Sequence, residues 1–145
     1  MLKDKIVNRD VLIDVREFDD KPGPFCMSFG FDITNIAESI KSVGLINKPY
    51  IRRTRSAGID IITGYRRILA LMSLNWKKIP CVEIVEPMPT DIDLLNLNIY
   101  DNICTRRFNL VEKGMILSRL KAHLIMEDIY SSYLGLLDIS SRREA

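Results

Sequence analysis

The chain has 145 residues, a formal net charge of +2 and an apolar fraction of 47%, enough for one domain with its own core, or one domain and part of another. No apolar run approaches 18 residues, and Asp4, Arg9 and Asp10 interrupt the N-terminus, which argues against a membrane span or signal peptide and predicts a cytoplasmic protein. Three widely spaced cysteines and one histidine give no zinc-ligand spacing, so we expect reduced, mostly buried thiols.

The first half of the chain is expected to contain a strand, a helix and a hairpin. Weak alternation predicts a strand at residues 11–15, and apolar residues at helical spacing predict a helix over 33–44 that ends at Gly44. Two β-branched segments, 50–53 and 59–63, are joined by turn residues and predict the hairpin.

The second half is expected to contain a helix, a strand and two further helices, at residues 65–74, 79–85, 91–103 and 109–126. Asn109 followed by Glu112 is typical of a capping box. The last residues, 142–145, resemble an interrupted helix. Because prolines break the chain near residue 88, we predict an α/β domain at 1–88 and a helical extension at 89–145.

Charge is distributed unevenly along these elements. Between Lys41 and Lys78 there are nine Lys and Arg residues and one acid, a local net charge of +8. Between Glu83 and Asp101 there are five acids and no Lys or Arg. Such asymmetry favours an anionic ligand at one face of the molecule.

The most informative motif is Gly64-Tyr65-Arg66-Arg67, where a strand meets a helix. Free N–H groups at a helix N-terminus, a glycine and two guanidinium groups together favour phosphate. Arginines at that end oppose the helix dipole, and an anion would relieve the conflict. The alternative is a solvated first helical turn.

Two further groups of residues carry candidate chemistry. Asp101 and Asn102 offer oxygen ligands for Mg²⁺, and nearby Arg106 could reach a phosphate, although a solvated loop would have the same composition. In the hairpin, Arg52 and Arg53 point to opposite faces of one strand and so cannot both serve one site. With Arg55 they form either a nucleic-acid contact or a solvated surface.

In chain order, these motifs resemble the N-terminal domain of the ParB family of chromosome and plasmid partition proteins, over about residues 33–125. The segments that carry the resemblance are Ser39-Ile40 with Gly44-Leu45 and Pro49, Gly64-Tyr65-Arg66-Arg67 with Ala70, Ile79-Pro80, Asp101-Asn102, and Asn109 with Glu112. The resemblance implies an α+β, ParB/sulfiredoxin-like fold, a small mixed β-sheet with packed helices, followed by a helical segment. The same fold also serves sulfiredoxin and a free-serine kinase, and the family is often described as nuclease-like.

The resemblance also implies a ligand, since family members bind CTP with Mg²⁺ and close a clamp on DNA. The nucleotide and phosphate residues would be Gly44, Leu45, Thr63, Gly64, Arg66, Arg67 and Arg106. Asn102 and Asp101 would hold the metal, with Asp101 as the catalytic residue. We expect a homodimer that contacts DNA mainly through regions beyond this chain.

Three positions depart from the family pattern. Tyr65 and Asp101 stand where the family has glutamates, and Thr105 stands at an arginine position next to Arg106. These departures favour nucleotide binding with slow hydrolysis at most. Two alternatives stay open: a phosphotransferase or nuclease using Asp101, Glu83 and Asp60, or a module that binds nucleic acid nonspecifically.

Overall fold

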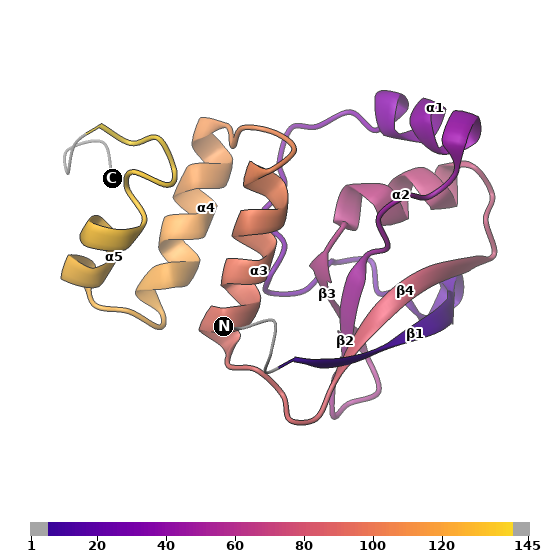
Figure 1. Ribbon diagram of the computed structural model, residues 1–145, viewed down its shortest axis with the longest axis horizontal. Coiled ribbons are helices and arrows are strands. Elements are labelled where there is room, and N and C mark those ends of the chain that lie inside the picture. The colour runs from indigo at the N-terminus through magenta and orange to yellow at the C-terminus, as the bar shows by residue number, and fades with distance from the viewer. Residues whose placement is uncertain (1–5, 141–145) are drawn as a thin grey trace.

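The computed structural model describes residues 6–140 (Figure 1). The described elements are β1 (Val7–Asp14), a 3₁₀ turn η2 (Val15–Glu17), α1 (Thr34–Val43), β2 (Tyr50–Arg53), β3 (Ile59–Thr63), α2 (Tyr65–Ser73), β4 (Lys78–Val85), α3 (Asp91–Ile103), α4 (Leu110–Lys121) and α5 (Met126–Ser132). No helix among these residues is long and apolar enough to cross a membrane.

The four described strands form one mixed sheet in the order β1-β4-β2-β3. β1 and β4 are antiparallel, β2 and β3 form the predicted antiparallel hairpin, and β2 runs parallel to β4. The predicted α+β class with a small mixed sheet is therefore confirmed. β1 begins at Val7, four residues before the predicted strand, because it pairs with β4 along its whole length, from Val7 opposite Val85 to Asp14 opposite Lys78.

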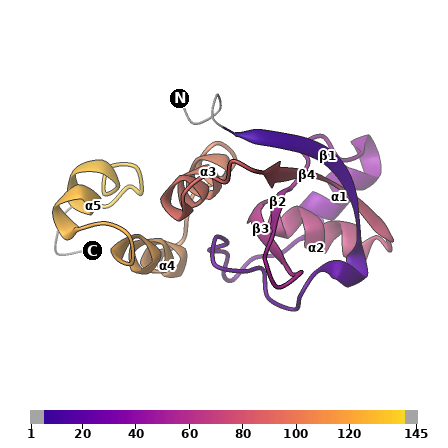
Figure 2. The same ribbon diagram turned by 90° about the horizontal axis from the view of Figure 1, so that it is seen from below.

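The sheet separates two apolar cores, because successive side chains of a strand point to opposite faces. In β3, Ile61 packs with residues of α1 and α2 in one core, whereas its neighbour Ile62 packs with residues of α3, α4 and α5 in the other. Figures 1 and 2 show α1 and α2 together on one side, and α3, α4 and α5 following one another away from β3. The division between residues 88 and 89 stays a prediction, and residues on both sides of it share the second core.

Helix starts follow the sequence closely. Thr90 and Asn109 each form a capping box, the first with Asp93 and the second with Glu112. α3 has the predicted bounds. Asn75, just after α2, has the left-handed conformation (φ 62°) expected of a residue that ends a helix.

The predicted end of the last helix, near Met126, is wrong. α4 ends at Lys121, and α5 begins at Met126 after a turn. The N–H of His123 donates to the Leu120 carbonyl, which tightens the helix end. Leu120 and Leu124 nevertheless reach the same core, so the apolar spacing continues through the turn. The segment predicted as an interrupted helix, 142–145, lies outside the described residues.

The three cysteines are free thiols. Cys26 and Cys81 are buried, and burial raises the pKa of each thiol to about 12. Cys104, at the end of α3, is exposed. The expectation of mostly buried thiols therefore holds for two of the three.

Candidate functional site

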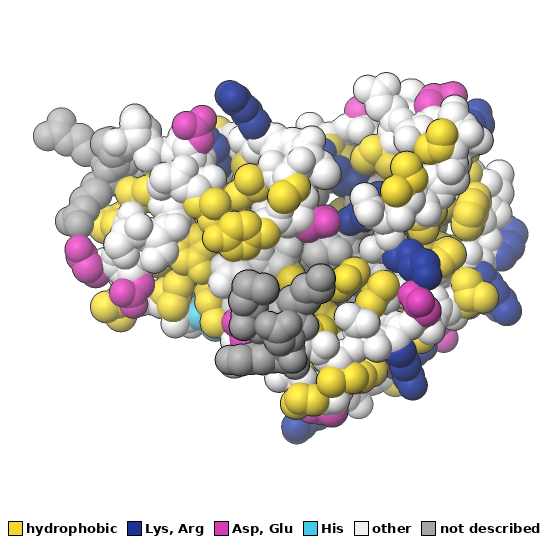
Figure 3. All heavy atoms as spheres, viewed as in Figure 1, with side chains coloured by type: hydrophobic (Ala, Val, Ile, Leu, Met, Phe, Trp, Pro, Cys, Tyr) yellow, Lys and Arg dark blue, Asp and Glu magenta, His cyan; other side chains and the backbone are white. Residues whose placement is uncertain are grey.

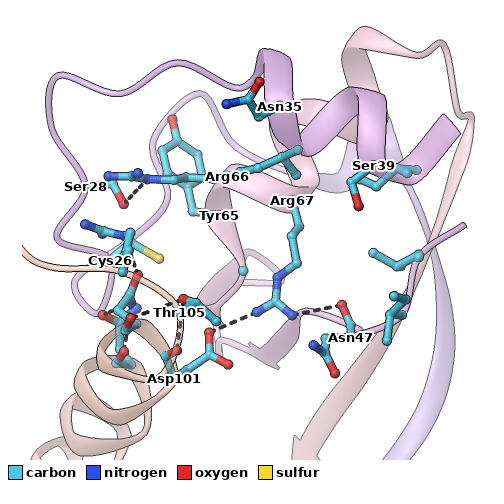
Figure 4. A pocket seen from close by; sticks show the side chains of 18 of the residues that line it. Cys26, Ser28, Asn35, Ser39, Asn47, Tyr65, Arg66, Arg67, Asp101 and Thr105 are labelled. Carbon is cyan, nitrogen blue, oxygen red and sulfur yellow. Dashed lines mark hydrogen bonds and ion pairs between the residues drawn. The ribbon is translucent and has the colours of Figure 1, made fainter. Parts of the chain in front are cut away.

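A cavity of about 520 Å³ lies where α1, the start of α2 and the end of α3 meet (Figure 4). Its size is in the range of pockets that hold small molecules. The residues that line it are Cys26, Ser28, Asp32, Asn35, Ile36, Ser39, Ile40, Gly44, Leu45, Ile46, Asn47, Gly64, Tyr65, Arg66, Arg67, Asn98, Asp101, Asn102, Thr105 and Arg106. Three stretches far apart in the sequence, residues 26–47, 64–67 and 98–106, thus supply one cavity.

Gly64 forms the turn that aims α2 at this cavity. Its φ is +87°, a left-handed conformation that favours glycine. A Cβ at this position would lie 2.9 Å from the Pro49 Cβ and 3.0 Å from the Arg67 Nε. α2 then starts at Tyr65 with no side-chain cap and no acid in its first turn. The N-terminal N–H groups of α2 therefore have no anionic side chain from their own helix beside them.

Arg66 and Arg106 reach one buried carboxylate, that of Glu112. Arg66 Nη2 donates to Glu112 Oε1 and Arg106 Nη1 donates to Glu112 Oε2, each at 2.6 Å. The Glu112 side chain is 1% exposed. Backbone N–H groups of Phe29 and Asn109 donate to the same carboxylate at 3.1 and 3.0 Å. Glu112 therefore joins the start of α2, the 25–31 segment and the start of α4.

Opposing effects set the pKa values of Glu112 and Arg66 in this cluster. Burial would raise the pKa of Glu112, but the hydrogen bonds from Arg106, Asn109 and Phe29 together outweigh it, so that the pKa lies below its usual value. Burial, followed by the nearby charge of Arg106, lowers the pKa of Arg66 although Glu112 opposes both effects. Two guanidinium groups share one carboxylate, which leaves an excess of positive charge at the cavity wall.

One nitrogen of Arg106 has no partner. Its Nη2 is buried and makes no hydrogen bond within residues 6–140, while Nε donates to Asn102 Oδ1 at 3.0 Å. A buried donor without a partner is costly, since it has lost water and gained nothing in exchange. Among the described residues, Arg106 thus keeps one buried donor without a partner, next to a cavity that other atoms of the residue line.

Arg67 crosses the cavity, as Figure 4 shows. Its Nη1 donates to the Asn47 carbonyl and its Nη2 to Asp101 Oδ2, each at 2.9 Å. The contacts connect the loop after α1 to α3. A guanidinium fixed on two sides in this way is a preorganised partner for a phosphate.

Asn102 is held inside the polar network. Its Nδ2 donates to Asn98 at 2.8 Å and its Oδ1 accepts from Arg106, while buried Asn98 donates to the Ile62 carbonyl in β3. No group of three or more His, Cys, Asp or Glu that could hold a metal occurs in the described part of the chain. A cation beside Asp101 and Asn102 would therefore need ligand oxygens or water to complete its coordination, as Mg²⁺ commonly does with phosphates.

The structure brings together most of the predicted site residues. Gly44, Leu45, Gly64, Arg66, Arg67, Asp101, Asn102 and Arg106 all line the cavity. Thr63 is the exception: it is 5% exposed, and its hydroxyl accepts from the Tyr50 N–H at 3.3 Å in the sheet. Its hydroxyl therefore supports the hairpin and is not among the groups that the cavity presents.

The hairpin arginines lie apart from the cavity and are mostly neutralised. Arg52 pairs with Asp60 at 3.0 Å and with Asp91 at 3.2 Å. Arg53 pairs with Glu83 at 3.3 Å. Asp60 and Glu83 are thus held on the sheet, and they do not join Asp101 in a shared acidic centre.

Sequence reasoning missed several cavity residues. Asn35 and Ser39 stand one helical turn apart on α1, and both line the cavity; their i, i+4 spacing was an available signal. Ser28 accepts from Arg66 Nε at 3.3 Å, and no local pattern marks it. Glu112 was predicted only as a capping residue, although it also holds two arginines.

Fold and cavity define an α+β domain with a cavity lined by three arginines, Arg66, Arg67 and Arg106. No family model matches the sequence. Over 85 residues, 54% of this chain, the sequence is 35% identical to a protein of Chlamydia muridarum described as "Probable chromosome-partitioning protein ParB". That match spans only 30% of the relative's length.

Solved structures share the fold. A C-terminally truncated ParB of Caulobacter crescentus complexed with CTP-γ-S has a TM-score of 0.54 at 18% identity, and the match covers 94% of this chain and 74% of the Caulobacter chain. A Pnob8-like ParB-N domain has a TM-score of 0.62 at 10% identity, and the match covers 90% of this chain and 52% of the ParB-N chain. The Caulobacter protein complexed to the centromeric parS site has a TM-score of 0.51 at 17% identity, and the match covers 90% of this chain and 65% of the Caulobacter chain. The chain is thus similar in sequence to a ParB over about half of its length, and its fold is that of ParB N-terminal domains.

Proposed function

We propose that this chain is the nucleotide-binding module of a DNA-partition protein and that it binds CTP in the cavity between α1, α2 and α3. The observation that carries the proposal is the convergence of Arg66, Arg67 and Arg106 on one cavity. The Caulobacter ParB of the same fold was solved with CTP-γ-S, which supports a cytidine nucleotide over a simpler anion.

In this proposal the two ends of the cavity have different tasks. The phosphates lie at the Gly64 turn, among the three arginines. The base lies against the loop at residues 44–47, where Leu45 and Ile46 offer an apolar surface beside Ile36 of α1. A cavity of about 520 Å³ has room for a nucleotide.

Mg²⁺ would be held by Asp101, with Asn102 beside it, and would neutralise charge on the phosphates. The residues fit this task in part, since Asp101 Oδ2 already accepts from Arg67 and the Asn102 oxygen accepts from Arg106. Asp101 is also the proposed residue for any hydrolysis. Because it is paired to Arg67 and Tyr65 stands where the family has a glutamate, we expect slow turnover at most.

We further propose that the full protein acts on DNA in the cytoplasm as a homodimer, with the main DNA contacts outside this chain. The fold is shared with a ParB solved on the parS site. The separation of Asp60 and Glu83 from the cavity disfavours the nuclease alternative, which needed those acids beside Asp101. The hairpin arginines, largely neutralised, leave Arg55 as the candidate for a weak nonspecific contact with nucleic acid.

Calorimetry with a panel of nucleoside triphosphates and Mg²⁺ tests the proposal. We expect CTP to bind and to raise the melting temperature, and Arg67→Ala to weaken binding about 100-fold, since it removes charged hydrogen bonds worth roughly 1.5–3 kcal/mol each. Arg53→Ala is the matched control and should bind CTP as the wild type does. If no nucleoside triphosphate binds the wild-type chain, the proposal is wrong.

Binding to random-sequence DNA tests the nonspecific alternative. Phosphate-driven binding weakens steeply as salt rises. Strong, salt-sensitive binding that Arg55→Ala abolishes, without any nucleotide effect, would favour that alternative.

A further inference from the structure

We infer that Glu112 is the positioning residue of the phosphate end of the cavity: its carboxylate holds the guanidinium groups of Arg66 and Arg106 side by side and oriented toward the ligand. This inference rests on the proposed nucleotide site and adds a residue to it. Glu112 does not line the cavity, so its effect on a ligand must pass through the two arginines.

The first step of the argument is that Glu112 itself is fixed. Besides the two arginines, it accepts hydrogen bonds from the backbone N–H groups of Phe29 and Asn109, and its own N–H donates to Asn109 Oδ1 at 2.9 Å. The capping box thereby locks the first turn of α4 around the carboxylate. With 1% of its side chain exposed, Glu112 cannot turn away to solvent.

The second step is that each guanidinium is held at two edges. Arg66 is bound through Nη2 to Glu112 and through Nε to Ser28. Arg106 is bound through Nη1 to Glu112 and through Nε to Asn102. This arrangement leaves Arg106 Nη2 as the buried donor without an acceptor. The ring of Phe31 lies 4.4 Å from the Arg66 guanidinium carbon and supports it from one side.

The third step decides between two roles for this charge. A carboxylate beside two arginines could compete with a phosphate for them, or it could hold them in place. Competition requires the carboxylate to give up its arginines, but two backbone N–H groups and the capping box keep it where it is. Without it, two guanidinium groups would face each other with no counterion. The geometry therefore favours positioning.

The test compares CMP, CDP and CTP binding to the wild type and to Glu112→Gln by calorimetry, well below the melting temperature of either. Glutamine keeps the shape of the side chain and loses its charge. We expect CTP affinity to fall about tenfold. The gain in affinity from CMP to CTP, which is the ratio of the two affinities and measures what the added phosphates contribute, should shrink by a similar factor. Glu112→Asp, which keeps the charge, should recover part of that gain.

Glu83→Gln is the matched control. Glu83 is also a buried glutamate between two arginines, Arg9 and Arg53, but these lie on the sheet and not at the cavity. It should lower the melting temperature without changing the gain from CMP to CTP. A purely structural role of Glu112 would likewise move the melting temperature alone, and that result would overturn the inference.

Two other outcomes are also decisive. Tighter CTP binding by Glu112→Gln would make Glu112 a competitor of the phosphate and overturn the inference. If the wild type binds none of the three nucleotides, the proposed function itself fails, which distinguishes that failure from the failure of Glu112 as a positioning residue. Should Glu112→Gln not fold, the comparison is made with Glu112→Asp, for which an unchanged gain would count against the inference.

Discussion

Two clusters in this domain have nearly the same composition: a buried glutamate between two arginines. Glu112 holds Arg66 and Arg106, whose side chains are 19% exposed, and the cluster borders the cavity. Glu83 holds Arg9 and Arg53, whose side chains are 63% and 44% exposed on the sheet. Only the first contains a buried donor without a partner, among the described residues. The two arginine–glutamate clusters therefore differ in burial and in their distance from the cavity, and not in composition.

The net charge of a sequence segment is a poor guide to the charge at a site, because acids from other segments can neutralise its arginines. The stretch from Lys41 to Lys78 carries a net charge of +8, and Figure 3 shows most of the Lys and Arg side chains on that face over the half of the molecule that holds the sheet, α1 and α2. The acids that neutralise Arg53 come from β4 and the η2 turn. Those acids lie outside the basic stretch, so only the fold reveals the pairing.

The largest difference between the clusters is expected in stability. Glu112→Ala leaves two poorly exposed arginines without a counterion and should lower the free energy of unfolding by about 3 kcal/mol. Glu83→Ala frees arginines that water can reach and should cost about 1 kcal/mol. Urea denaturation of both variants measures the contrast. Equal losses would mean that burial of the arginines does not distinguish the clusters.

A smaller effect is expected from the turn that aims Arg66 at the first cluster. Gly64→Ala adds a Cβ at φ +87° and within 3 Å of Pro49, so it should destabilise the domain by about 2 kcal/mol and weaken CTP binding. Gly58→Ala, in the turn of the hairpin, meets only the tips of two side chains and should leave CTP binding unchanged. Calorimetry and denaturation of both variants check this. If Gly64→Ala changed neither the free energy of unfolding nor the CTP affinity, the turn would tolerate a side chain.

The smallest effect is expected from pH. The pKa of Glu112 is lowered in the folded state, so its charge contributes stability that is present above the pKa of an unfolded glutamate, about 4.3, and that is lost as pH falls through the folded pKa. The stability difference between wild type and Glu112→Gln should therefore be constant from pH 7 to about 5 and narrow below about pH 4. Denaturation at several pH values measures this difference. A gap that widens in acid would contradict the lowered pKa.

Much of the fold could be predicted from the sequence, because its signals are local. Local sequence patterns located β2, β3 and α3 with the bounds that the structure has, and the cap residue Asn109 located the start of α4. The motif at Gly64 to Arg67 was also read as an anion site from neighbouring residues alone, and the structure places it at a cavity. The family resemblance, stated from the order of such motifs, is confirmed.

The sequence by itself determined where most of the strands and helices form, which glycine turns the chain into α2, and which arginines follow it. Only the tertiary structure decided which charges meet. Glu112 lies 46 positions after Arg66 along the chain, and Glu83 and Arg53 meet because β2 lies parallel to β4. The reason is physical: helix and turn formation depend on contacts within a few residues, whereas the pairing of buried charges depends on how separate elements pack, and no short sequence window contains that information.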